Sequence, residues 1–139
     1  ASQAGVDVEI LVRGMCALKP GVAGLSETIK VRSVLGRYLE HSRAFAFNGG
    51  GDPAVFIGSA DMMHRNLDRR VEALVRLVQP DHIREINDLF DLAMSQESAS
   101  WSLNSNGEWV RHQFGENGSR LIDVQDQLMK VVHSKRNAR

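Results

Sequence analysis

Short segments in which polar and apolar residues alternate recur through the first 80 residues of the chain. Every second side chain of a strand faces the same side, so this alternation predicts strands with one buried face. The predicted strands span residues 7–13, 29–35, 43–47, 54–57 and 70–78. Loops rich in Gly and Pro separate them at residues 14–24 and 48–53, and residues 60–66 can form one helical turn.

The last third of the chain changes to helical spacing. From Asp81, which can cap a helix, apolar residues recur three, four and seven positions apart on one stripe. Residues 100–103 and 108–113 flank the segment Asn104-Ser105-Asn106-Gly107, which indicates a hairpin. A final helix is predicted to open at Gly118-Ser119, and its apolar face would contain Leu121, Ile122, Leu128, Met129 and Val132. Strands and helices together predict the α/β class.

The composition fits one globular domain over residues 1–139. The chain weighs 15.4 kDa, with 42% hydrophobic and 24% charged residues, which is too apolar for a disordered chain. No apolar run approaches the roughly 18 residues that a membrane-spanning helix needs. Residues 1–5 lack the features of a secretory signal. Cys16 is the one cysteine, so no internal disulfide can form and a reducing compartment is expected.

The formal net charge is zero, because 17 Lys and Arg balance 17 Asp and Glu, but the charge is unevenly distributed. Residues 13–76 carry ten basic and six acidic residues, a net charge of +4, while the segments before and after each carry −2. Thirteen of the 17 basic residues are Arg, whose planar fork of donors matches two phosphate oxygens at once. The central segment therefore indicates phosphate recognition, although an ordinary ion-paired surface would have the same composition.

His41-Ser42-Arg43 is the first candidate for chemistry. Side chains two positions apart at a strand edge project to the same side, so the imidazole and the guanidinium would face one ligand. An imidazole can act as nucleophile, base or acid near neutral pH, and the Arg would hold charged oxygens. Gly58-Ser59 follows 17 residues after His41 and would offer backbone N–H groups and a hydroxyl to the same anion. The alternative is a surface His beside a surface Arg.

Two further segments are candidates for anion binding. Arg13-Gly14 ends the first predicted strand, and ligands of open α/β sheets gather beyond the carboxyl ends of strands. Residues 62–70 combine three Arg with Asp68, which would orient an Arg toward a polyanion. Strand-end capping and local salt bridges are the alternatives. The sequence has no P-loop pattern, and its His residues show no metal-ligand spacing with each other or with Cys16.

These segments resemble, in order and in register, the final catalytic domain of bacterial polyphosphate kinases. The matching motifs are residues 11–21, 29–43, 58–63 and 65–72. The resemblance covers nearly all of residues 4–80 and continues more weakly to the end. Several long motifs in one register make the resemblance highly specific.

The resemblance implies a phospholipase-D-like α/β domain with a mixed β-sheet flanked by helices. Polyphosphate kinases transfer the terminal phosphate of ATP to inorganic polyphosphate, reversibly and with Mg²⁺. By resemblance, the phosphorylated His and the magnesium-linked Arg residues belong to the preceding domain, so no metal ligand is expected in this chain. The chain would be the last of four domains of a cytoplasmic homo-oligomer, with a peripheral position at the inner membrane as an alternative. It would be inactive alone, and its partners would be ATP or ADP, polyphosphate and the remaining domains, but not nucleic acid.

The resemblance also assigns residues to the site. It gives His41 the role of an acid/base partner, and it makes Arg13 and His41 contacts of the nucleotide phosphates. Further candidates for binding the polyanionic chain are Arg37, Arg43, Ser59, Arg65 and Arg69.

Some residues depart from the related families. Ala44 and Ala46 are smaller than the residues usual beside that His, and phospholipase D enzymes use His-x-Lys where this chain has His41-x-Arg43. The Arg argues against diester hydrolysis. A phosphodiesterase or nuclease of the phospholipase D superfamily, acting as a dimer, is the alternative enzyme. A polyanion-binding or oligomerisation module is the non-enzymatic alternative.

Overall fold

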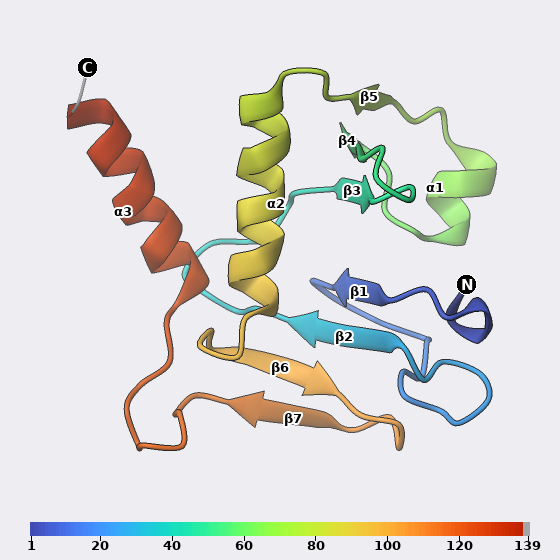
Figure 1. Ribbon diagram of the computed structural model, residues 1–139, viewed down its shortest axis with the longest axis horizontal. Helices are drawn as coiled ribbons and strands as arrows, with labels where there is room; N and C mark the ends of the chain where they lie inside the picture. Colours follow the sequence, from blue (N-terminus) through green and yellow to red (C-terminus); the bar gives the residue numbers. More distant parts are fainter. Residues whose placement is uncertain (138–139) are drawn as a thin grey trace. The chain divides into compact units, whose positions relative to one another are not determined.

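The computed structural model describes residues 1–137, which form two compact units (Figure 1). Unit 1 contains residues 1–40 and the chain from Asp91 onward, and unit 2 contains His41–Phe90. Each unit has its own β-sheet. The α/β class predicted from the sequence is confirmed, and the expectation of a single domain over residues 1–139 stays a prediction.

Unit 1 contains a mixed four-stranded sheet in the order β1-β2-β6-β7. Its strands are β1 (Val8–Leu11), β2 (Ile29–Ser33), β6 (Ser100–Leu103) and β7 (Trp109–His112). β1 and β2 are parallel, whereas β6 pairs antiparallel with both β2 and β7. The long loop between β1 and β2 begins with the Gly-rich segment that the sequence predicts, and a short 3-10 helix (Ser2–Ala4) precedes β1.

The hairpin of β6 and β7 forms where Asn104-Ser105-Asn106-Gly107 predicts it. Asn104 Oδ1 accepts hydrogen bonds from the N–H groups of Asn106 and Glu108 over 3.0 and 2.9 Å. Gly107 has a φ of +85°, a conformation that glycine adopts without strain. The side chain of Asn104 therefore stabilises the turn that sets the register of the two strands.

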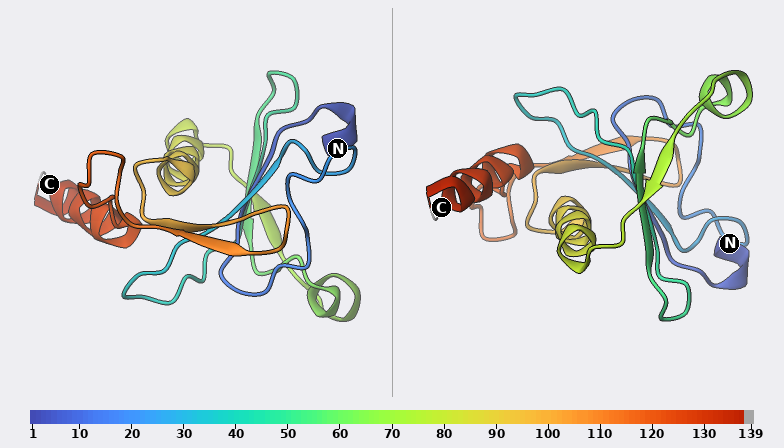
Figure 2. Two further views of the ribbon diagram at one scale, coloured as in Figure 1. Left: turned by 90° about the horizontal axis from the view of Figure 1, so that it is seen from below. Right: turned by 90° about the horizontal axis from the view of Figure 1, so that it is seen from above.

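The core of unit 1 lies where the end of β2, the end of α2 (Pro80–Met94) and the start of α3 (Val124–Asn137) meet. Val34, Ala93 and Val124 are buried there, and they are covered by Leu11, Leu92 and Leu128. Only Val124 and Gln125 of α3 are buried, and Figures 1 and 2 show this helix extending away from the sheet after its first turn. The first turn of α3 therefore attaches the helix to the unit.

α3 begins later than the sequence predicts. The pattern places its start at Gly118-Ser119, but residues 114–122 form isolated β-bridges instead. The N–H groups of Leu121 and Ile122 donate to the carbonyls of Gln113 and Glu97, so these groups are used by bridges rather than by a helix. Leu121 and Ile122 are therefore not on the helix face where they were expected. Asp123 caps the helix instead, because its Oδ1 accepts the N–H of Asp126 over 3.0 Å.

Unit 2 contains an antiparallel three-stranded sheet in the order β3-β4-β5. Its elements are β3 (Ala44–Phe47), β4 (Ala54–Gly58), α1 (His64–Arg69) and β5 (Leu74–Arg76). Val55 is 1% exposed, and Phe47 and Phe56 contact each other edge to face with ring centroids 6.3 Å apart. β5 is shorter than the predicted strand 70–78, and Val71 and Val78 lie outside it as exposed residues.

The start of α2 also corrects the sequence analysis. Asp81 is predicted as its cap, but the helix begins at Pro80 and contains Asp81 in its first turn. Proline suits the first position of a helix because its missing N–H is not needed there. Asp81 forms an ion pair with Arg84. The negative charge of Asp81 still lies where the helix dipole favours it.

Candidate functional site

His41 and Arg43 lie in unit 2 at the entrance to β3. Arg43 Nη1 donates a hydrogen bond to His41 Nδ1 over 2.8 Å and contacts the His41 carbonyl oxygen over 3.2 Å. His41 is exposed, whereas the Arg43 side chain is 16% exposed. The two side chains therefore share one side of the chain, as their spacing predicts.

Asp61, which follows β4, holds the other side of the Arg43 guanidinium. Arg43 Nε and Nη2 donate to Asp61 Oδ1 and Oδ2, each over 3.1 Å. A two-point contact of this kind fixes the plane of a guanidinium. Hydrogen bonding to Asp61 raises the pKa of Arg43 above its usual range, although partial burial opposes the shift. The sequence pattern indicated no role for Asp61, although it lies two residues after Ser59 within the matching motif 58–63.

Arg43 Nη1 lies close to both ring nitrogens of His41, 2.8 Å from Nδ1 and 3.5 Å from Nε2. A guanidinium has hydrogen-bond donors and no acceptor, so the neutral His41 ring takes part in this contact as an acceptor. The guanidinium thus holds the exposed imidazole at the entrance to β3.

Ser59 belongs to a second hydrogen-bonded group of unit 2. Its hydroxyl donates to Glu72 Oε2 and accepts the N–H of Ala73 over 3.1 Å. Asn66, a buried residue of α1, donates to Glu72 Oε1 over 2.7 Å. The hydrogen bonds from Ser59 and Asn66 lower the pKa of Glu72, and Ser59 has the larger effect. Because Glu72 engages the Ser59 hydroxyl, the expected contact of Ser59 with a polyanion stays a prediction.

Arg13 lies in unit 1, just beyond the carboxyl end of β1. The N–H of Val12 still donates to the Arg32 carbonyl over 2.8 Å, so pairing with the neighbouring strand reaches the residue before Arg13. Arg13 is exposed, and its Nη1 donates to the Glu40 carbonyl over 3.2 Å. The sheet thus places Arg13 at the strand end where ligands of α/β sheets gather.

Gln125 holds the segment that precedes His41, although sequence analysis gave it no role. Its side-chain amide makes three hydrogen bonds, two to the backbone of Tyr38 and one to the Glu40 carboxylate. The partners lie 87 and 85 residues away along the chain. No local pattern could have indicated this contact.

The other candidate Arg residues occupy different environments. Arg37 is exposed in unit 1, and Arg65 and Arg69 are exposed on α1, so their contact with a polyanion stays a prediction. Asp68, which was expected to orient an Arg, contacts the imidazole Nδ1 of His64 one turn earlier on the same helix. Arg32 is 8% exposed within β2, where burial lowers its pKa and its guanidinium donates to the Ser95 carbonyl.

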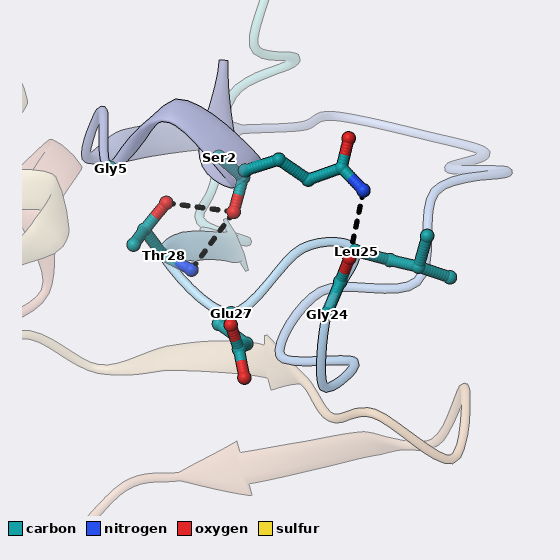
Figure 3. A pocket seen from close by; sticks show the side chains of 7 residues that line it. Ser2, Gly5, Gly24, Leu25, Glu27 and Thr28 are labelled. Carbon is teal, nitrogen blue, oxygen red and sulfur yellow. Dashed lines mark hydrogen bonds between the residues drawn. The ribbon is translucent and has the colours of Figure 1, made fainter.

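A surface hollow of about 390 Å³ in unit 1 lies at the amino ends of β1 and β2, at the opposite end of these strands from Arg13 (Figure 3). It is lined by Ser2, Gln3, Gly5, Gly24, Leu25, Glu27 and Thr28. Polar groups of the lining bond to one another: Ser2 Oγ accepts the Thr28 N–H over 3.1 Å, and Gln3 donates to the Gly24 carbonyl over 2.8 Å. The hollow contains none of the predicted site residues.

Among residues 1–137, no group of three or more His, Cys, Asp and Glu side chains is arranged to hold a metal ion. Within the same residues, no helix has both the length and the apolar character that crossing a membrane requires. Two carboxylates of unit 2 are already engaged: Arg43 binds Asp61, and Ser59 and Asn66 bind Glu72.

Comparison with known proteins identifies the relatives of the chain. Residues 1–125 match the family described as polyphosphate kinase C-terminal domain 2. The polyphosphate kinase of Streptomyces coelicolor is 57% identical over 136 residues, which are 98% of this chain and 18% of that protein. Polyphosphate kinase 1 of Chlorobaculum tepidum is 42% identical over 130 residues, or 94% of this chain and 18% of that protein.

A solved structure agrees with these sequence matches. The crystal structure of polyphosphate kinase from Porphyromonas gingivalis superposes with a TM-score of 0.87 and 30% identity, over 99% of this chain and 21% of that one. The phospholipase-D-like α/β fold expected from the sequence is thereby confirmed. The chain spans about a fifth of the length of these relatives, and neither kind of match supports the phosphodiesterase alternative.

Proposed function

The chain belongs to the polyphosphate kinase C-terminal domain 2 family, and on that premise we propose that it supplies part of the phosphotransfer site of a polyphosphate kinase. The reaction would be the reversible transfer of the terminal phosphate of ATP to inorganic polyphosphate. The family resemblance places the phosphorylated His in another domain of the same enzyme. This chain would therefore act on the transferring group without forming the covalent bond to it.

The observation that carries the proposal is the contact between Arg43 and His41. The hydrogen bond from Arg43 over 2.8 Å holds the exposed His41 ring, and an imidazole can donate an N–H or take up a proton. An N–H donor stabilises negative charge on the oxygens of a phosphoryl group during transfer, and its proton can pass to a departing oxygen. In the reverse reaction the same nitrogen takes the proton back. Asp61 keeps the guanidinium in the orientation that this contact requires.

Arg13 would bind a nucleotide phosphate. It is exposed at the carboxyl end of β1, and a guanidinium can donate to two phosphate oxygens at once. Arg37, Arg65 and Arg69 are exposed as well, and they would contact the polyphosphate chain. Transfer of this kind depends mainly on positioning and charge neutralisation, which Arg residues provide.

The other parts of the proposal rest on the family resemblance. Mg²⁺ would accompany the nucleotide and would help to neutralise its phosphates. Since the described residues offer no cluster of ligands for a metal ion, no step assigned to this chain passes through it. The remaining domains, a homo-oligomeric state and a cytoplasmic location complete the proposal.

The decisive experiment is His41→Ala in the full-length kinase that carries this chain. We expect the conversion of ATP to polyphosphate to fall by a factor of about 10² to 10⁴, the usual contribution of a general acid or base. His82→Ala is the matched control, because His82 is an exposed histidine on α2. Wild-type turnover of the His41→Ala enzyme would contradict the proposal and would favour a module that only binds polyanions.

A further inference from the structure

The side-chain amide of Gln125 binds the backbone of the segment that leads to His41, as a neighbouring strand would. Residues 34–43 form neither helix nor strand, and pairing with β4 begins at the end of this range, where the Arg43 carbonyl accepts the Gly58 N–H over 3.0 Å. Gln125 Oε1 accepts the N–H of Tyr38 over 2.7 Å, and Nε2 donates to the Tyr38 carbonyl over 2.8 Å. An amide that pairs with both backbone groups of one residue satisfies them as a strand partner would.

The position of Gln125 is itself fixed by packing. Gln125 is 7% exposed, and it follows Val124, which is 4% exposed in the core of unit 1. Val34 and Leu11 belong to the same core cluster. The cluster thus anchors the first turn of α3 beside the start of the irregular segment. A buried amide on a fixed turn holds its partners more firmly than an exposed one does.

Gly36 makes room for this amide. A Cβ on residue 36 would overlap the Oε1, Cδ and Cγ atoms of Gln125. The φ of Gly36 is not positive, so glycine is required here for the close approach and not for a turn conformation. The absence of a side chain at Gly36 therefore lets the irregular segment pack directly against Gln125.

Glu40 connects the amide with both predicted site residues. Gln125 Nε2 also donates to Glu40 Oε1 over 2.5 Å, and the Glu40 carbonyl accepts Arg13 Nη1 over 3.2 Å. The residue after Glu40 is His41. Gln125 thus binds Glu40. The Glu40 carbonyl accepts the hydrogen bond from Arg13, and His41 is the next residue in the chain.

We propose that Gln125 is a positioning residue for phosphotransfer, which acts by fixing Tyr38 and Glu40 and through Glu40 the side chain of Arg13. This inference rests on the proposed function of Arg13. Positioning contributes strongly to phosphoryl transfer, because small displacements of a catalytic group reduce the rate severely. Gln125 needs no contact with the substrate for this role.

The test is a cycle of variants in the full-length kinase. Gln125→Glu removes the donor to Tyr38 and sets a carboxylate against Glu40, so we expect kcat to fall about tenfold while KM for ATP changes less. Glu40→Gln alone keeps an acceptor for the amide of Gln125, and its effect should be small. The double variant Glu40→Gln/Gln125→Glu exchanges donor and acceptor between the two positions but leaves the Tyr38 carbonyl without its donor, so it should recover part of the lost kcat.

Gln127→Glu is the matched control, because it makes the same charge change two positions further along α3. It should keep the kcat of the wild type. If Gln125→Glu fails to fold, as judged by thermal unfolding, Gln125→Met provides the same comparison with an apolar side chain of similar length. A normal kcat in the folded Gln125 variant, or a double variant whose kcat is no higher than that of Gln125→Glu, would overturn the inference.

The two proposals can fail separately. An active His41→Ala enzyme overturns the proposed function whatever the Gln125 variants do. An inactive His41→Ala enzyme together with an unimpaired Gln125→Glu enzyme overturns only the positioning role.

Discussion

At the scale of single residues, Arg43 makes contacts that its place in the sequence does not indicate. Sequence analysis places it among the groups that bind a polyanion. In the structure its Nε and Nη2 donate to Asp61, and its Nη1 donates to His41. Arg43 therefore links a carboxylate to an imidazole. Binding of polyphosphate by Arg43 stays a prediction.

The first prediction concerns Asp61. Asp61→Asn removes one of the two carboxylate oxygens that hold Arg43, so the guanidinium is less constrained and His41 loses its fixed partner. We expect kcat of the full-length kinase to fall about tenfold or more, with a smaller change in KM for ATP. Steady-state kinetics measures both values. Asp52→Asn, in the exposed turn between β3 and β4, is the control, and an equal effect of both substitutions would contradict the prediction.

The second prediction concerns the pH dependence of stability. Hydrogen bonds from Ser59 and Asn66 lower the pKa of Glu72 in the folded chain, so its ionised form stabilises the fold. This stabilisation is complete above the pKa of the unfolded chain and is lost as the pH falls through the lower folded pKa. Glu72→Gln should therefore lower the urea midpoint at pH 7 and have little effect near pH 2. A difference between the two proteins that grows toward low pH would contradict the assignment.

At the scale of elements, α3 shows which features a sequence pattern can predict and which it cannot. The apolar spacing predicts the helix correctly, and the hairpin before it follows from the Asn and Gly residues of its turn. The start of α3 is displaced because residues 114–122 find bridge partners elsewhere in the chain. Such pairings depend on distant segments, so local spacing carries no information about them.

The third prediction tests the start of α3. Asp123→Ala removes the side-chain acceptor for the Asp126 N–H, and loss of such a cap typically costs about 1 kcal/mol. The free energy of unfolding, measured with urea, should fall by that amount. Asp123→Asn keeps a capping oxygen and should stay close to the wild type. Equal stability of all three proteins would show that another group caps the helix.

The candidate site was predictable to the extent that its residues are close in sequence. His41 and Arg43 are two positions apart just before β3, so their closeness could be expected from the sequence. Arg13 follows a strand, so its place at the strand end could be expected too. The bonds of Asp61 and Gln125 join positions 18 and up to 87 residues apart. They arise from the folded chain and leave no periodic signal.

At the scale of the whole molecule, the net charge of zero conceals a basic segment. The surface of this segment is less basic than its composition indicates. Residues 13–76 carry a net charge of +4. Yet Arg32 is buried within β2, and Arg43 is bound to Asp61. The Arg residues available to a ligand are therefore a subset that only the structure separates from the rest.

The fourth prediction concerns this available subset. Arg65 and Arg69 are exposed on α1, so the double variant Arg65→Ala/Arg69→Ala should weaken polyphosphate binding to the full-length kinase. Its dissociation constant should also depend less on salt, because fewer screened contacts remain. Titrations at several salt concentrations measure both effects. Arg84→Ala, in the net acidic part of the chain, is the control, and an equal loss in both proteins would refute the role of α1.

The space left by Gly36 has a consequence for inheritance. Any side chain at position 36 would collide with the amide of Gln125, and loss of Gln125 would leave the Tyr38 backbone without its partner. Neither residue can change alone without harm to the segment before His41. Among descendants of this chain, Gly36 and Gln125 should therefore be kept together or be replaced together. Substitutions at these two positions, which lie far apart in the gene, are therefore expected to be correlated.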